Sequence, residues 1–198
     1  MLKNSLNYLE LQSKKFSKEN KVFDIVLYGS AARSKEEPND IDILMIFVNE
    51  TLEKRLEILQ KFKSIVKAGM IKVFPIIKNL DVKTINLPEL FDKNLLSKEG
   101  IIVEGFSLVH HKPFSSSIGF KGYVLFLYDL KNMNHNEKTK FTYALIGRNN
   151  EGILKITNSN QFGKGSISAP IENSEIVEDF MKKWKVNYRK KKILISEA

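Results

Sequence analysis

The chain has 198 residues, with 32 lysine and arginine against 23 aspartate and glutamate side chains, and it contains no cysteine. The lack of cysteine excludes disulfides and thiolate metal sites, and no apolar run approaches the ~20 residues that span a bilayer. The amino terminus has no apolar signal core, so we expect a cytoplasmic protein without a membrane partner. The net charge of +9 indicates either a polyanionic partner or a lysine-rich solvated surface.

Hydrophobic periodicity predicts helices and strands in alternation over the first 110 residues. The predicted helices span 2–19, 51–68 and 87–97, and the predicted strands span 22–28, 40–48 and 71–77. The strand at 22–28 is apolar apart from Asp24, which predicts a central position in the sheet. Gly69 is expected to end the helix at 51–68, and Pro88 to open the helix at 87–97. The run 101–103 is expected to lead out of that helix.

The second half of the chain predicts a smaller and more basic domain. Pro113 and three consecutive serines predict a linker at 111–120, between a domain at 1–110 and another at 121–198. The last part holds 14 lysine and arginine against 8 acidic residues, a net charge of +6. Its predicted strands span 122–130, 153–157 and 166–169, and its predicted helices span 134–146 and 173–185. We therefore expect an α/β (α+β) protein with a mixed sheet and a smaller α+β domain.

Two polar features follow the first two strands. Gly29 and Ser30 end the apolar run at Tyr28, and Asp40 and Asp42 open the next strand. Carboxylates two apart on a strand project from one face, where their repulsion is relieved by a divalent cation such as Mg²⁺. Glycine lets a ligand approach the backbone, and free amides at the start of a helix suit an anion such as a triphosphate. Each feature alone is also common at ordinary turns and strand ends.

Together with Arg33, this motif resembles the nucleotidyltransferase superfamily that includes DNA polymerase β, and most closely its small prokaryotic, or minimal, members. The resemblance covers about residues 20–105. It implies that Gly29 and Ser30 hold the phosphates of a nucleoside triphosphate, while Asp40 and Asp42 bind Mg²⁺ or Mn²⁺ and carry catalysis. The implied reaction moves a nucleoside monophosphate onto a hydroxyl of an RNA, a protein or a small molecule. Arg33 either adds charge to the triphosphate site or pairs with a nearby glutamate.

Members of this superfamily typically carry a third carboxylate on the next strand. The predicted strand 71–77 has no acid; Asp81 follows it, and Glu104 lies on a later segment. Three interpretations stay open: two carboxylates suffice, Asp81 or Glu104 replaces the third, or the domain binds nucleotide without transferring it. In the last case the chain is a nucleotide- or RNA-binding module with an RNA or protein partner, for example a component of a toxin–antitoxin pair.

A basic cluster lies near the end of the chain, in a region for which no family resemblance is identified. Its members are candidates for binding nucleic acid: Lys182, Lys183, Arg189, Lys190, Lys191 and Lys192. Single-stranded nucleic acid binds such surfaces through backbone charge and base stacking. Trp184 lies among these cations but also fits the apolar face of the last helix, and we assign it to the core.

Overall fold

The computed structural model describes residues 2–32, 40–73, 79–95 and 97–196 of the chain. The chain folds as two compact units, Met1–Gly119 and Phe120–Ala198. Both contain helices and strands, in agreement with the predicted α+β composition. Among the described helices, none is long and apolar enough to cross a membrane.

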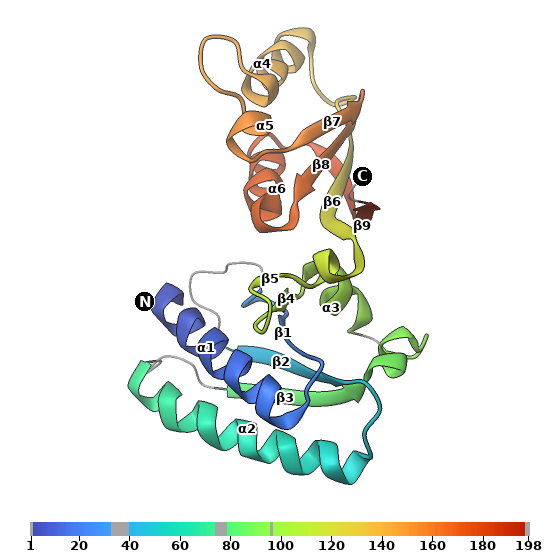
Figure 1. Cartoon of the computed structure of the whole chain (residues 1–198). Helices are drawn as coiled ribbons and strands as arrows, with labels where there is room; N and C mark the ends of the chain where they lie inside the picture. The colour runs from blue at the N-terminus through green and yellow to red at the C-terminus, as the bar shows by residue number, and fades with distance from the viewer. Residues whose placement is uncertain (1, 33–39, 74–78, 96, 197–198) are drawn as a thin grey trace. The chain divides into compact units, whose positions relative to one another are not determined.

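A mixed sheet organises the N-terminal unit (Figure 1). Its described strands are β1 (Asp24–Tyr28), β2 (Asp40–Phe47), β3 (Asn79–Asn86), β4 (Phe106–Ser107) and β5 (Lys112–Pro113). They lie in the order β3-β2-β1-β4-β5, so β1 is central, as its apolar sequence predicts. β1 pairs antiparallel with β2 and β4, whereas β3 runs parallel to β2.

Each face of this sheet is buried under different elements. Residues 41, 43, 45 and 47 of β2 pack in one core with α1 (Leu2–Asn20) and α2 (Leu52–Val73). Within that core, Phe16 of α1 meets Phe62 of α2 edge to face, at 5.1 Å between ring centroids. Leu44 and Ile46 point the other way, into a second core with η1 (Leu87–Phe91), α3 (Lys98–Glu104) and η2 (Phe114–Ile118). Odd and even residues of β2 therefore mark the two faces.

The predicted strand at 71–77 is wrong in its described part, residues 71–73. Helix α2 continues through Gly69 to Val73, residues 74–78 lie outside the described ranges, and the third strand is β3 at Asn79–Asn86. A single glycine costs a helix interior only about 1 kcal/mol, so a long helix passes it without ending. Ala31 and Ala32 form a turn after β1, and residues 33–39 also lie outside the described ranges.

The segment after β3 also differs from prediction. Of the described residues in the predicted helix 87–97, only Leu87–Phe91 are helical, as a 3-10 helix, and residues 98–104, which include the run expected to lead out of that helix, form α3. Most of the expected linker 111–120 is folded into the N-terminal unit as β5 and η2, because Phe114 is buried in the second core at 1 % exposed. The polar composition of the segment 111–120 predicted a linker, although it contains this buried phenylalanine.

The C-terminal unit has a four-stranded antiparallel sheet in the order β7-β8-β6-β9. Its strands are β6 (Phe120–Asp129), β7 (Asn160–Gly163), β8 (Ser166–Pro170) and β9 (Asn187–Ser196). Its helices are α4 (His135–Ile146), α5 (Ile153–Ile156) and α6 (Ser174–Lys183), with the 3-10 helix η3 (Ile171–Asn173) before α6. This βαββαβ order, with β8 between β6 and β7 and β6 between β8 and β9, is a split βαβ topology.

Most predicted elements of this unit are confirmed. Helix α4 begins with a capping box, in which Asn134 Oδ1 accepts from Glu137 N and Glu137 Oε2 accepts from Asn134 N. Trp184 packs on Phe141 and Phe180, with ring centroids 5.7 and 6.2 Å away, as its core assignment predicts. The predicted strand at 153–157 is wrong, because residues 153–156 form α5 and the hairpin partner of β8 is β7.

Candidate active site

The end of β1 brings the backbone against a carboxylate. Gly29 follows Tyr28 and has φ +77°, a left-handed conformation that glycine adopts at little cost. A Cβ atom placed on Gly29 would lie 2.6 Å from Asp42 Oδ2, far inside van der Waals contact. Gly29 therefore serves two needs at once: it turns the chain, and it leaves room for the Asp42 carboxylate beside the turn.

Asp40 and Asp42 lie on β2 as the sequence predicts. Asp42 pairs with Tyr28 across the antiparallel ladder, and Asp40 is exposed at the beginning of the strand. Both have the parity of Leu44 and Ile46, so they lie on the sheet face opposite α1 and α2. The two carboxylates thus share one face, beyond the apolar residues that the second core covers.

Asp81 lies on the next strand, beside these two carboxylates. In the parallel ladder between β2 and β3, Asp42 is opposite Asp81 and Asp40 is opposite Asn79. Asn79 Nδ2 donates a hydrogen bond of 2.9 Å to Asp40 Oδ1. Neighbouring strands are about 4.8 Å apart, so the register places a third acid on the same face next to Asp42. The expectation that the third strand carries no acid is therefore wrong.

Sequence reasoning missed this arrangement because it chose the wrong strand. The segment 71–77 is the more apolar, whereas β3 alternates polar and apolar residues. That alternation is itself the signal: Leu80 and Val82 pack toward α1 and α2, while Asp81 and Lys83 face the other side. The alternative acid, Glu104, is buried on α3.

The electrostatics of the site reflect crowded negative charge. Burial raises the pKa of Asp42, and the nearby carboxylates of Asp81 and Asp40 raise it further. Lys83 opposes this effect, and its Nζ lies 3.1 Å from Asp81 Oδ2. The hydrogen bond to Asp81 is the main cause that raises the pKa of Lys83. Burial also raises the pKa of the Tyr28 phenol, which lies next to the same charges.

The donors of this site fit a hard divalent cation. Carboxylate oxygens are the ligands that Mg²⁺ and Mn²⁺ prefer, and a cation would relieve the repulsion that raises the pKa of Asp42. In the side-chain arrangement of the described residues, however, no three metal-binding groups are gathered around one point. Asp81 instead pairs with Lys83, which supplies a positive charge at the site.

The remaining nucleotide-binding candidates are placed only in part. Ser30 follows Gly29 in the turn after β1 and is half-buried, next to the buried Ala31. Arg33 lies outside the described residues, so its assignment to the triphosphate stays a prediction.

The structure separates the six cations of the C-terminal cluster. Lys182 and Lys183 lie in the last turn of α6, and Lys182 Nζ is 3.4 Å from Asp179 Oδ1. Lys190 on β9 also pairs with α6, at 2.8 Å from Glu178 Oε2. The other three are on β9 as well, where successive residues alternate between the two faces of the sheet. They are Arg189, Lys191 and Lys192.

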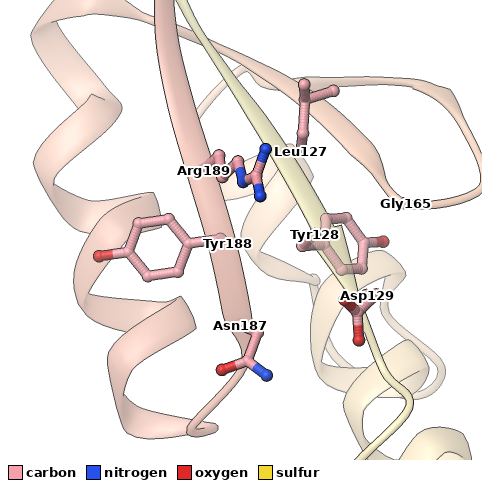
Figure 2. Close-up of a pocket in the computed structure, with 7 residues that line it drawn as sticks. All are labelled: Leu127, Tyr128, Asp129, Gly165, Asn187, Tyr188 and Arg189. Carbon is pink, nitrogen blue, oxygen red and sulfur yellow. The ribbon is translucent and has the colours of Figure 1, made fainter.

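Two hollows flank the end of β6 in this unit. The first has a volume of about 400 Å³, and Leu127, Asp129, Asn187 and Arg189 are among its lining residues (Figure 2). The second has a volume of about 500 Å³ and is lined in part by Thr142, Gln161 and Lys164. Tyr128, Asp129 and Gly165 line both hollows. Arg189 is the lining residue that belongs to the basic cluster identified from the sequence.

Comparison with known proteins agrees with the N-terminal geometry. No curated protein and no solved structure matches the chain. A family model described as polymerase beta, nucleotidyltransferase, matches residues 12–105. That range begins in α1, ends just after α3 and includes Gly29, Asp40, Asp42 and Asp81. The N-terminal unit of this chain therefore belongs to the polymerase β-like nucleotidyltransferase superfamily.

Proposed function

We propose that the chain is a Mg²⁺- or Mn²⁺-dependent nucleotidyltransferase whose acidic residues are Asp40, Asp42 and Asp81. The observation that carries this proposal is the parallel register that places Asp81 opposite Asp42. It supplies a third carboxylate next to the two that follow the Gly29 turn. The family match supports transferase chemistry in general, and the three acids make the proposal specific.

The proposed roles follow from position and chemistry. Asp40, Asp42 and Asp81 would hold the divalent metal, which when bound neutralises charge that develops on the phosphates. Gly29 leaves the backbone open to the β- and γ-phosphates of a nucleoside triphosphate, and the Ser30 amide and hydroxyl are donors beside it. In this proposal Asp81 also acts as the general base that accepts the proton of the attacking hydroxyl.

The acceptor in this proposal is a hydroxyl group of an RNA, a protein or a small molecule. The absence of cysteine fits the reducing cytoplasm as the place of action. The alternative function, a nucleotide- or RNA-binding module without transfer, was motivated by a missing third acid. Because Asp81 lies on β3, the argument for this alternative no longer holds. The label-transfer assay described below distinguishes the two functions.

A label-transfer assay tests the proposal. The wild type, Asp40→Asn/Asp42→Asn and Asp81→Asn are each incubated with α-labelled nucleoside triphosphates, Mg²⁺ or Mn²⁺, and total cell RNA and protein. Asp92→Asn is the control, because it removes an exposed acid of the same unit outside the β1–β3 face. We expect label in RNA or protein with the wild type and with Asp92→Asn only. Nucleotide binding without transfer by the wild type would favour the binding module instead.

A further inference from the structure

The sheet of the C-terminal unit is covered by helices on one face (Figure 1). Val124, Phe126, Ile167 and Ala169 are buried on that face, and the Tyr128 ring lies 5.7 Å from that of Phe141 on α4. Residues of the opposite parity therefore form a second face, which no described helix of this unit covers. We call it the open face.

The pairing register identifies the residues of the open face. In the antiparallel ladder of β6 and β9, Leu127 is opposite Arg189, and Leu125 is opposite Lys191. Two further pairs on the same face are Tyr123 with Ile193 and Lys121 with Ile195. Lys121 Nζ lies 5.7 Å from the centre of the Tyr123 ring. The cations Arg189 and Lys191 thus lie together at one end of the face and Lys121 lies at the other end, with apolar and aromatic side chains beside and between them.

Charge is distributed unequally between the two faces of β9. Lys190, on the helix side, is neutralised by Glu178. Arg189 and Lys191, on the open face, are both exposed, and within the described part of the chain neither forms an ion pair. Among the strand residues that the register of β6 and β9 places on this face, Asp129 is the acid. The open face therefore has a net positive charge, which comes from cations that form no ion pair within the described part of the chain.

The hollow of about 400 Å³ lies at the paired ends of β6 and β9, and its lining combines residues 127, 129, 187 and 189 of the open face with Tyr128 and Tyr188, which have the opposite parity (Figure 2). Leu127, which is 39 % exposed, supplies apolar surface, and the side chains of Asn187, Asp129 and Arg189 supply both donors and acceptors. A planar base needs such a combination: an apolar or planar surface for its ring and polar groups for its edge. Unpaired cations further along the strands suit the phosphates of its neighbours.

We propose that the open face binds single-stranded nucleic acid, with a base in the hollow beside Leu127 and Arg189 and the backbone along Lys191 and Lys121. This surface differs from the basic cluster predicted from the sequence. It excludes Lys190, whose charge is neutralised on the helix side, and it adds Lys121 from β6. The proposal goes beyond nucleotide transfer, because binding at this surface requires neither the metal nor a nucleoside triphosphate.

Fluorescence anisotropy tests the proposal with the full chain, in EDTA and without nucleotide. The probes are fluorescein-labelled 12-nucleotide single strands of mixed sequence, as RNA and as DNA, and a duplex of the same sequence. The open-face variant is Arg189→Gln/Lys191→Gln. Its control is Lys182→Gln/Lys183→Gln, which removes the same charge from the end of α6. A melting temperature within about 2 °C of the wild type is the criterion for an intact fold.

We expect the wild type to bind single strands more tightly than duplex, and the open-face variant to bind them at least about 10-fold more weakly at about 100 mM salt. The slope of log K against log salt should become shallower by about 0.7, because the variant loses the phosphate contact of Lys191 and each such contact contributes about 0.7. The affinity of the control variant for single strands should stay within about twofold of the wild-type value. Arg189→Lys should keep the salt slope but lose affinity, since lysine lacks the planar guanidinium.

Several results would overturn the proposal. Wild-type chain that binds no single strand would refute it directly. Equal losses of affinity in the open-face variant and its control would mean that binding depends on the overall positive charge and not on this face. Tighter binding of duplex, or equally effective competition by an acidic peptide, would assign the surface to another partner. None of these results depends on whether the N-terminal unit transfers nucleotides, because both metal and nucleotide are absent and Asp40→Asn/Asp42→Asn should bind normally.

Discussion

Replacing Gly29 by alanine should impair the site through one added methyl group. Two effects follow from the structure. Alanine in the left-handed conformation at φ +77° costs about 1–2 kcal/mol. In addition, its Cβ would lie 2.6 Å from Asp42 Oδ2, so that the carboxylate or the turn must move by about 0.8 Å to restore ordinary contact near 3.4 Å.

Gly119→Ala separates these two effects. Gly119 has φ +78°, but a Cβ there meets nothing within 4 Å. Both variants should therefore lose about 1–2 kcal/mol of unfolding free energy, a fall in Tm of about 2–8 °C. Only Gly29→Ala should also lower the transfer rate, by at least about tenfold, since a displacement near 1 Å at a reacting group can cost about a hundredfold.

The assay compares melting by circular dichroism with the label-transfer rate for the wild type and both variants. Mn²⁺ affinity, measured by electron paramagnetic resonance, gives a readout that requires no acceptor. If Gly29→Ala transfers label and binds Mn²⁺ as well as Gly119→Ala does, the close approach of Gly29 to Asp42 has no functional meaning and the reasoning is refuted.

Three further predictions concern stability. Phe62→Ala should lower the unfolding free energy by about 3–5 kcal/mol in denaturant titration, because the ring is fully buried; a loss below about 1 kcal/mol would contradict its core position. Asn134→Ala should cost about 1 kcal/mol by removing the cap on Glu137 N, and an unchanged Tm would show that the capping box contributes nothing. Burial raises the pKa of Asp24, which accepts a hydrogen bond from Ser107, so the contribution of Asp24 to the unfolding free energy should fall as pH rises from the unfolded-state pKa of about 3.9 through the higher folded-state pKa. Asp24→Asn should flatten that dependence in melts between pH 4 and 8, and an equal slope in both proteins would refute the assignment.

The sequence predicts most of the N-terminal site because its signals are local. A glycine turn directly follows the apolar strand β1, and two carboxylates open β2, so their positions follow from chain order and strand alternation. The third carboxylate is different, because its place depends on the register between β2 and β3. That pairing joins residues about 39 positions apart, as in the Asn79–Asp40 hydrogen bond, and strand propensity favours the wrong segment.

In the C-terminal unit, local patterns predict α4, α6 and β6 but not the faces of the sheet. Lys190 and Lys191 are neighbours in a run of four cations, and only the packing of α6 makes one of them a partner of Glu178. The hollow beside Leu127 and Arg189 depends on the pairing of β6 with β9, whose residues lie about 60 positions apart in the chain. Composition therefore predicts the positive charge of this unit but not the hollow on its surface.

The central claim is that Asp81 joins Asp40 and Asp42 in one metal-binding transfer site. Its most direct test is the Mn²⁺ dissociation constant of the wild type, Asp81→Asn and the control Asp92→Asn, with a non-reactive nucleoside triphosphate analogue bound. We predict at least about tenfold weaker binding for Asp81→Asn and no change for Asp92→Asn. Equal Mn²⁺ affinity in the wild type and Asp81→Asn would contradict the claim.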